Sequence, residues 1–305
     1  LILTINSPKG FCELTQQPSK DLETNNLLLT HYPRYFDIDM RYYPGANNHQ
    51  KGVNRTRLTV LIAIRFSIIT PGIVRWLYGI NHRLALEHLN RQEKDGLLRV
   101  VKTHRSPDGR VYVPTYTAAK FAEELMGIDV HFRSNKNPSL QFNQNNIMHN
   151  LINAFVMLRG IHNYHSDETY APMWSGFITE PEFKRINNLS DTRTVDGAVR
   201  LLDGSVAAIE IEHSFKNKTA RQVILLKYLA SLKKSDYSKI FLFSQSVKIF
   251  DDIKRLHEQL LTELPERYDK KTRAPLLSES DAELLRASII YRTKLCEEIN
   301  EMFYS

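Results

Sequence analysis

The sequence predicts a two-domain protein of mixed α+β or α/β class, on three observations. Residues 56–127 carry three helix signals, a hairpin and a fourth helix, which is the layout of a winged helix-turn-helix. A polar linker occupies residues 128–140. Three strand signals, a helix and a buried strand follow, a pattern typical of an α/β core. We therefore expect an extended arm over 1–50, a winged-helix DNA-binding domain over 51–130 and an α/β domain over 140–305.

The charge balance indicates the class of partner. The chain has 305 residues, with 41 Lys and Arg against 34 Asp and Glu, a net charge of +7. This surplus favours a polyanionic partner, usually nucleic acid or a membrane surface, although an ordinary basic protein has the same balance. No apolar run reaches the roughly 18–20 residues that a transmembrane helix needs, so we expect no membrane insertion.

The two cysteines, Cys12 and Cys296, lie far apart in the chain. They leave no disulfide framework and no CxxC pair for zinc, which fits a reducing compartment. Because no secretory signal is visible either, we expect a cytoplasmic protein.

The arm is polar and rich in proline, without a helical period. It contains an aromatic cluster of Tyr32, Tyr35, Phe36, Tyr42 and Tyr43. Such clusters usually pack onto a domain, so we expect the arm to dock on the rest. Stacking of these rings on single-stranded bases is a second possibility.

The elements of the winged-helix unit follow from caps and turns. Thr70-Pro71 supplies an N-cap and a first-turn proline, and Asn81 caps the next helix. Ser106-Pro107-Asp108-Gly109 is a turn signal between two short strands. The predicted helices are 56–69, 71–78, 81–94 and 117–125, and the predicted strands are 97–103 and 111–116.

The third of these helices has a polar face suited to a recognition helix. That face carries Arg83, Glu87, Asn90, Arg91 and Lys94, opposite an apolar side of Leu84, Ala85 and Leu89. Arginine reads guanine and asparagine reads adenine in the major groove. Arg105 and Arg110 on the wing would contact phosphates or the minor groove. The alternative is a solvated helix face in a winged helix that contacts protein.

The second domain begins with an amphipathic helix over 143–158. Strands are expected over 170–178, 194–202 and 205–212, the last two joined by an Asp203-Gly204 turn. A helix over 219–232, with Thr219 and Gln222 as its capping box, then leads to a buried strand over 239–243. At least two helices end the chain.

Three carboxylates converge on the last hairpin. The turn brings Asp196 back towards the next strand, where Glu210 and Glu212 share a face about 7 Å apart, with Ile209 and Ile211 packed in the core behind them. Like charges beside apolar residues repel unless a cation neutralises them. We expect Mg²⁺ or Mn²⁺ bound by Asp196, Glu210 and Glu212, with Glu212 positioning a water or acting as general base. The alternative is a solvent-facing strand edge.

Two lysines and a histidine are further candidates. Lys227 lies on an imperfect inward stripe of Ala220, Val223, Ile224 and Ala230, from which it could reach Glu212 or a phosphate. It could instead extend to solvent, and Lys216 competes for the same role or contacts DNA. His149 is a packing residue, or else a phosphate contact or a proton donor near the metal. The polar stretch 162–168, with its tight His-x-x-His spacing, is interpreted as a loop rather than a zinc site.

These residues carry a family resemblance. The segment resembles the PD-(D/E)xK nucleases, which have a restriction-endonuclease-like core, with Val195-Asp196 at the Pro-Asp position and Glu210-Ile211-Glu212 at the (D/E)xK position. This chain departs from the family motif in two places: Val195 replaces the proline, and the strand has no lysine after Glu210-Ile211. Some members carry the lysine on the following helix instead, where Lys227 lies in this chain. Over residues 56–250 the chain is similar to the MobC-class plasmid relaxases and replication-relaxation proteins, which share in this order stretches resembling Met148-His149-Asn150-Leu151, Val195-Asp196-Gly197, Glu210-Ile211-Glu212 and Leu226-Lys227-Tyr228.

The resemblance implies a function. The implied function is site- and strand-specific nicking at a plasmid transfer origin. The implied partners are duplex and single-stranded DNA of that origin, a relaxosome accessory protein and a coupling protein. Better-known relaxases attach a tyrosine to the DNA 5′ end, which makes the arm tyrosines conceivable nucleophiles. Two other functions stay open: a DNA-binding replication or transfer regulator without catalysis, and a site-specific restriction or repair endonuclease.

Overall fold

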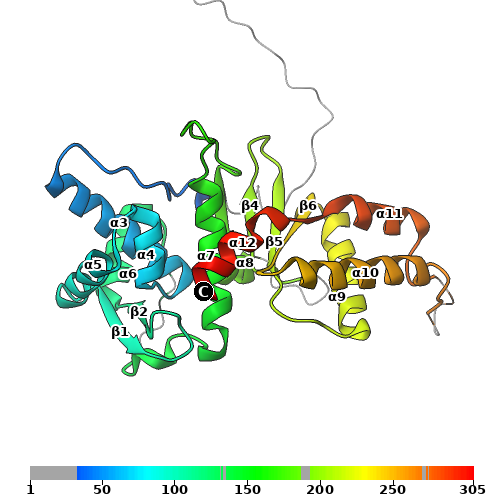
Figure 1. Cartoon of the computed structure of the whole chain (residues 1–305). Coiled ribbons are helices and arrows are strands. Elements are labelled where there is room, and N and C mark those ends of the chain that lie inside the picture. The colour runs from blue at the N-terminus through cyan, green and yellow to red at the C-terminus, as the bar shows by residue number, and fades with distance from the viewer. Residues whose placement is uncertain (1–32, 131, 133–134, 187–192, 270–272, 274) are drawn as a thin grey trace, which may run out of the picture.

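The computed structural model describes residues 33–130, 132, 135–186, 193–269, 273 and 275–305. Figure 1 shows a central helix, α7, between an N-terminal helical part and a sheet flanked by helices. The helices are α2 (Pro33–Phe36), α3 (Asn48–Phe66), α4 (Pro71–Tyr78), α5 (His82–Lys94), α6 (Tyr116–Met126), α7 (Ile147–Ile161), α8 (Glu180–Ile186), α9 (Lys218–Lys233), α10 (Val247–Glu263), α11 (Glu279–Ser288) and α12 (Cys296–Phe303). The strands are β1 (Leu98–Lys102), β2 (Arg110–Pro114), β3 (Gly176–Thr179), β4 (Gly197–Arg200), β5 (Val206–Ile211), β6 (Lys239–Phe243) and β7 (Ile289–Tyr291), and short 3₁₀ turns lie at Pro138–Leu140, Gln144–Asn146 and Thr293–Leu295. The predicted mixed α/β class is confirmed.

The N-terminal part follows its predicted caps. The side chains of Thr70 and Asn81 accept from Ile73 and Leu84 and begin α4 and α5. β1 and β2 pair antiparallel, from Leu98 opposite Pro114 to Lys102 opposite Arg110. Gly109 ends the turn between them at a φ of 66°, a left-handed conformation that glycine adopts without strain. These elements have the predicted order: three helices, a hairpin and a fourth helix.

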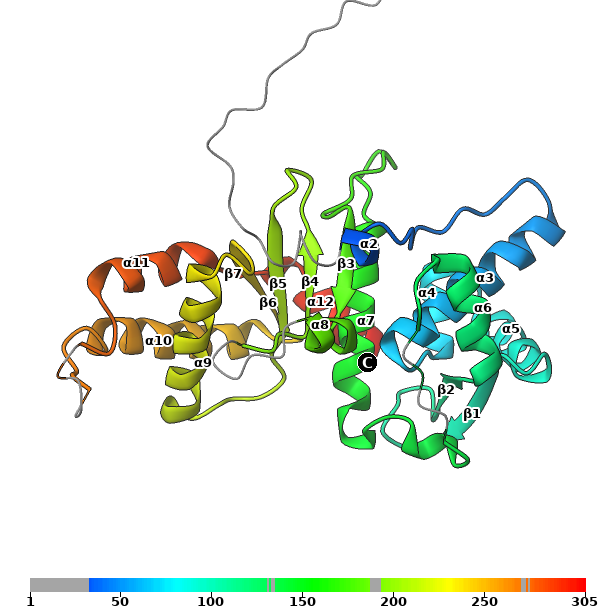
Figure 2. The same cartoon turned by 180° about the vertical axis from the view of Figure 1, so that it is seen from behind.

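The C-terminal sheet has five strands in the order β3-β4-β5-β6-β7. β3, β4 and β5 pair antiparallel, whereas β5-β6 and β6-β7 are parallel. β5 is therefore the central strand, and the helix α9 forms the crossover from β5 to β6. Figure 2 shows this sheet from behind, between α7 and the group of α9, α10 and α11.

The two faces of the sheet belong to two hydrophobic clusters. Ala207, Ile209 and Ile211 pack with α7 and α12, in a cluster that continues into the N-terminal part. Val206 and Ala208 pack with residues of α9, α10 and α11. Because side chains alternate along a strand, the even-numbered residues of β5 face α9, so Glu210 and Glu212 share the buried α9 side of the sheet.

Several predicted boundaries were wrong for identifiable reasons. α3 begins at Asn48, inside the predicted arm, because the Asn47 side chain caps it. Strand β3 begins only at Gly176, because Trp174 packs on Gly160 of α7 and donates to the Met157 carbonyl. The cap of α9 is Asn217 rather than Thr219, since Asn217 Oδ1 accepts from the Ala220 amide.

Two predicted helix faces were also partly wrong. Leu84, assigned to the apolar side of its helix, is 46% exposed, whereas Ala85 and Leu89 are buried. On α9, Val223 is 48% exposed, and the buried face consists of Arg221, Ile224, Leu225, Tyr228, Leu229 and Ser231. The predicted stripe through Lys227 is therefore rotated relative to the inward face.

The described part of the arm docks on the rest of the chain. Phe36 and Met40 are buried, and the Tyr42 amide donates to His162 Nε2 at 2.9 Å. This contact also gives the His162 ring a structural role. Tyr32 and Cys12 lie outside the described residues, and Cys296 is a buried free thiol.

Candidate functional site

The predicted carboxylates meet where β4 begins and β5 ends. The Asp196 amide donates to the Ile209 carbonyl at 3.0 Å, and Asp196 Oδ2 accepts from the Ile211 amide at 2.7 Å. Glu210 is 1% exposed and Glu212 is fully buried. The alternative of a solvent-facing strand edge is therefore wrong, because β5 is central and both glutamates lie inside.

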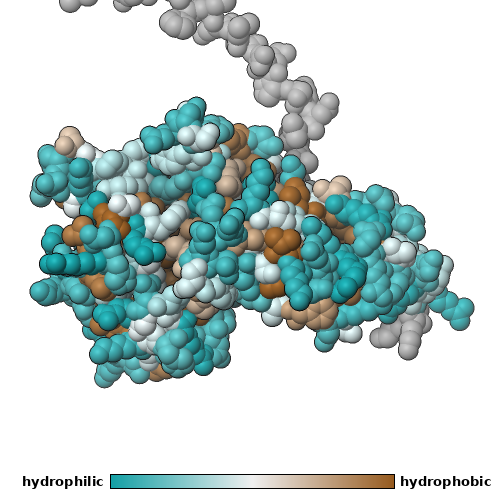
Figure 3. All heavy atoms as spheres, in the orientation of Figure 1, coloured by the Kyte–Doolittle hydropathy of each residue, from teal (hydrophilic) through white to brown (hydrophobic). Residues whose placement is uncertain are grey.

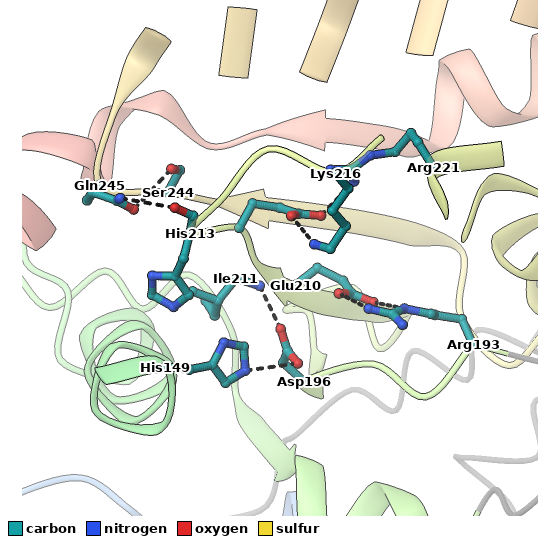
Figure 4. Close-up of polar contacts among 11 residues, drawn as sticks. His149, Arg193, Asp196, Glu210, Ile211, His213, Lys216, Arg221, Ser244 and Gln245 are labelled. Atoms are coloured by element: carbon teal, nitrogen blue, oxygen red, sulfur yellow. Dashed lines mark hydrogen bonds and ion pairs between the residues drawn. The ribbon is translucent and has the colours of Figure 1, made fainter. Parts of the chain in front are cut away.

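Each carboxylate contacts a different basic side chain (Figure 4). His149 Nε2 lies 3.1 Å from Asp196 Oδ1. Arg193 donates two hydrogen bonds to Glu210, at 2.7 and 2.9 Å.

Glu212 is held between two cations. Arg221 Nη1 lies 2.6 Å from Glu212 Oε1, and Lys216 Nζ contacts Glu212 Oε2. Arg221 and Glu212 are both fully buried, so this pair lies away from water. The site thus neutralises its carboxylates one by one with side chains from α7, α9 and the loops.

The electrostatics of the three carboxyl groups differ. Burial and the charge of Asp196 raise the pKa of Glu210, against the opposing effect of Arg193. For Asp196, burial is the largest single effect and would raise the pKa, but the hydrogen bond and charge of His149, the Ile211 amide and Arg193 together lower the pKa. Burial likewise opposes ionisation of Glu212, whose pKa is nevertheless lowered by Arg221 and Lys216. Asp196 and Glu212 are therefore stable anions, whereas Glu210 resists ionisation.

A group with metal-ligand geometry includes one residue that the sequence did not indicate. Ligand atoms of His149, Glu180 and Asp196 all lie within 4.8 Å of one another. They come from α7, from the first position of α8 and from the residue before β4. Two carboxylates and one imidazole are a donor set that a divalent ion accepts, so these residues fit a metal ion.

The predicted metal ligands relate to this group in different ways. Asp196 belongs to it, and His149, first considered as a proton donor, is a second member. Glu210 of β5 and Glu212, one residue beyond this strand, contact arginine and lysine side chains instead. Their coordination of Mg²⁺ or Mn²⁺ stays a prediction. Glu180 had no sequence signal, because an acidic residue in the first turn of a helix is common as a dipole partner.

The cations of the site were only partly predicted. Lys216 contacts Glu212, as one interpretation allowed. Lys227 is half-buried on α9. Arg221, about one turn and a half nearer the start of the same helix, contacts Glu212. Arg193 and Arg221 were missed, since an isolated arginine on a loop or at a helix start carries no spacing signal.

The residues predicted to contact DNA are mostly exposed. Arg83, Asn90, Arg91 and Lys94 lie on the outer face of α5. Arg83 pairs with Glu87 at 2.8 Å, and Asn90 Oδ1 accepts from the Tyr112 hydroxyl at 2.7 Å. On the hairpin, Arg105 is exposed and Arg110 is half-buried.

The described arm tyrosines make contacts within the protein. The Tyr42 hydroxyl accepts from Arg55 Nε at 3.1 Å, and the Tyr43 ring lies against Arg41. A different tyrosine lies beside the candidate site: the Tyr304 hydroxyl is 3.3 Å from His213 Nδ1, and the His213 ring centroid is 5.3 Å from that of His149.

The molecular face in Figure 3 is mostly hydrophilic, with smaller hydrophobic areas between. None of the helices in the described residues is long and apolar enough to cross a membrane. No protein-family model, curated protein or solved structure matches this chain.

Proposed function

We propose that this protein is a metal-dependent DNA endonuclease that nicks one strand at a plasmid transfer origin and so initiates conjugative mobilisation. The observation that carries the proposal is the grouping of His149, Glu180 and Asp196 within 4.8 Å, near the buried glutamates at the end of β5, Glu210 and Glu212. Buried acids at the end of a central strand are costly unless they bind a cation. A restriction-endonuclease-like core with a preceding winged helix is the finer fold that we propose with it.

The chain's residues have distinct parts in this activity. His149, Glu180 and Asp196 would hold Mg²⁺ or Mn²⁺, with Glu210 and Glu212 as further oxygen donors nearby. When bound, the ion supplies positive charge for the phosphate and lowers the pKa of a bound water. Arg221 and Lys216 hold the Glu212 carboxylate in one orientation, which suits it to position that water. Arg193, 27% exposed at its side chain, can contact either Glu210 or a phosphate oxygen.

The N-terminal part would choose the site of nicking. Its exposed arginines on α5, with Lys94, form a basic face, and the hairpin adds Arg105. This arrangement supports recognition of duplex DNA, and a net charge of +7 supports binding of a polyanion. Cytoplasmic action with a relaxosome accessory protein and a coupling protein belongs to the same proposal.

The test is relaxation of a supercoiled plasmid that carries the transfer origin found with this gene. We expect Mn²⁺- or Mg²⁺-dependent nicking of one strand, mapped by primer extension, and none in EDTA. Asp196→Asn and Glu210→Gln should lose activity, whereas Glu124→Gln, an exposed acid on α6, should nick as wild type. Wild-type rates in Asp196→Asn would refute the site.

A specific observation favours a second candidate, a DNA-binding regulator without catalysis. Each of the three carboxylates contacts a cationic side chain, so these acids are partly neutralised without a metal ion. A regulator would give sequence-specific gel shifts and no cleavage with any divalent ion. Double-strand breaks would instead indicate a restriction or repair endonuclease.

A further inference from the structure

A pocket of about 480 Å³ lies between the β1–β2 turn, the start of α7 and the end of α12. It is distinct from the carboxylate site, and its residues come from three separate parts of the chain. The lining includes Arg105, Ser106, Gln144, Asn145, Met148 and Phe303. In both views the C-terminus lies beside α7 (Figures 1 and 2), which brings α12 to this place.

One polar group of a pocket residue, the Ser106 hydroxyl, lacks a hydrogen-bond partner among the described residues. Ser106 is only 5% exposed. A buried polar atom without a partner is costly. Arg105 contacts the side-chain oxygen of Asn145 across the pocket, and both side chains are exposed enough to accept a new partner.

The other side of the pocket is apolar. Met148 is half-buried and Phe303 is 6% exposed. The pocket therefore combines a guanidinium, amide groups and a hydroxyl with a thioether and an aromatic ring. This combination of groups suits a nucleotide. A guanidinium can contact its phosphate, amide groups can bond to the edge of its base, and apolar side chains can pack on the face of its base.

The pocket adjoins the candidate metal site. Met148 precedes His149, whose imidazole contacts Asp196. Phe303 precedes Tyr304, whose hydroxyl lies 3.3 Å from His213, and His213 packs edge-on against His149. Two residues that line the pocket are thus sequence neighbours of residues in the contacts around the metal ligands.

From this arrangement we infer that the pocket binds one unpaired nucleotide of the DNA strand next to the nick. The inference rests on the proposed function. Arg105 contacts the phosphate, Asn145 and Gln144 bond to the base edge, and Met148 and Phe303 lie against the base. The volume falls within the range of about 300–1,000 Å³ for small-ligand sites. A nucleotide held here would connect the hairpin to the cutting site and set the distance between recognition and cleavage.

The test uses EDTA, so that binding is measured without cleavage. The probe is a fluorescein-labelled single-stranded oligonucleotide of the origin strand, followed by anisotropy. Asn145→Trp fills the pocket from an exposed position, and Arg105→Gln removes the charge. We expect each variant to weaken single-strand binding by about tenfold, with Arg255→Gln, at an exposed arginine of α10, as the control that leaves it unchanged.

A second measurement places the nucleotide directly. The same oligonucleotide with 5-iodouracil is photo-crosslinked to the wild-type protein, and the modified peptide is identified by mass spectrometry. Crosslinks at Met148 or Phe303 support the inference. Crosslinks elsewhere only, or unchanged binding by Asn145→Trp, would overturn it. Suppose that crosslinks form in the pocket but the protein nicks no plasmid with any divalent ion. Nucleotide binding by the pocket would then stand, and the proposed endonuclease activity would be refuted.

Discussion

Arg65 of α3 forms a two-pronged ion pair with Glu182 of α8, with Nε–Oε1 at 2.9 Å and Nη2–Oε2 at 2.8 Å. Both side chains are less than 10% exposed. Arg65 also donates to the Phe177 carbonyl, and Glu182 accepts from the Thr179 amide. Because α8 begins at Glu180, this pair connects the N-terminal part of the molecule to the candidate metal group.

The first prediction concerns that connection. Arg65→Met should lower the free energy of unfolding by about 3–5 kcal/mol, because it leaves Glu182 buried without its partner. The double variant Arg65→Met/Glu182→Leu should recover much of this loss. Urea denaturation measures both, with exposed Arg75→Met as the control, expected within about 0.5 kcal/mol of wild type. Equal loss in the single and double variants would contradict the explanation.

The second prediction concerns the metal group. His149→Ala and Glu180→Gln should each weaken Mn²⁺ binding at least about tenfold, measured by calorimetry. Wild-type protein should bind Mn²⁺ more tightly than Mg²⁺, because Mn²⁺ accepts the imidazole nitrogen of His149 more readily than Mg²⁺ does. If Glu180→Gln binds Mn²⁺ as tightly as wild type, Glu180 is not a metal ligand. The carboxylate ligands would then be Asp196, Glu210 and Glu212.

The third prediction separates the two lysines. Lys216→Ala should slow nicking by about 10- to 100-fold, because Lys216 contacts Glu212. Lys227→Ala should have a smaller effect, since the Glu212 carboxylate keeps its contacts with Arg221 and Lys216 in that variant. Single-turnover nicking rates at saturating metal compare the two variants. A larger effect of Lys227→Ala would support the sequence-based prediction that Lys227 is the lysine that acts at the site.

The fourth prediction is a pH dependence of stability. Burial lowers the pKa of His88 to about 4, with Arg55 and Arg91 adding to the effect, and its ring bonds to the Thr59 hydroxyl. The unfolded chain binds a proton near pH 6.5 and the folded chain only near 4, so stability falls as the pH drops through this window. The loss is at most about 3 kcal/mol.

His88→Gln should flatten this acid dependence, because it removes the group that charges on unfolding. Urea midpoints measured from about pH 7 to about pH 4.5 give the slope. His82→Gln, an exposed histidine of the same helix, is the control and should keep the wild-type slope. A wild-type slope in His88→Gln would show that other groups dominate acid unfolding.

The fifth prediction concerns duplex DNA. Arg91→Ala and Lys94→Ala should each lower the salt dependence of duplex binding by about one unit of log–log slope. Asn90→Ala should instead relax the sequence preference, and it also frees the Tyr112 hydroxyl. Titrations at several salt concentrations measure both effects. Unchanged slopes would show that α5 does not face DNA.

Local spacing was enough to predict the elements around the site. The Asp203-Gly204 turn and the alternation of Glu210 and Glu212 with isoleucines predict two paired strands with both acids on one face, which β4 and β5 have. The caps Thr70 and Asn81 likewise predict the starts of α4 and α5. These signals are local because hydrogen bonds of caps, turns and pleats join residues a few positions apart.

By itself, then, the sequence determined the class of the fold and the acids Asp196, Glu210 and Glu212 as a spatial group. Only the tertiary structure decided which side chains meet them: His149 from α7, Arg193 from a loop, Arg221 from α9 and, nearest to Asp196 and His149, Glu180 from α8. The physical reason is that these contacts depend on how helices pack across both faces of the sheet. That packing is set by the summed burial of two hydrophobic clusters rather than by the spacing of any one segment.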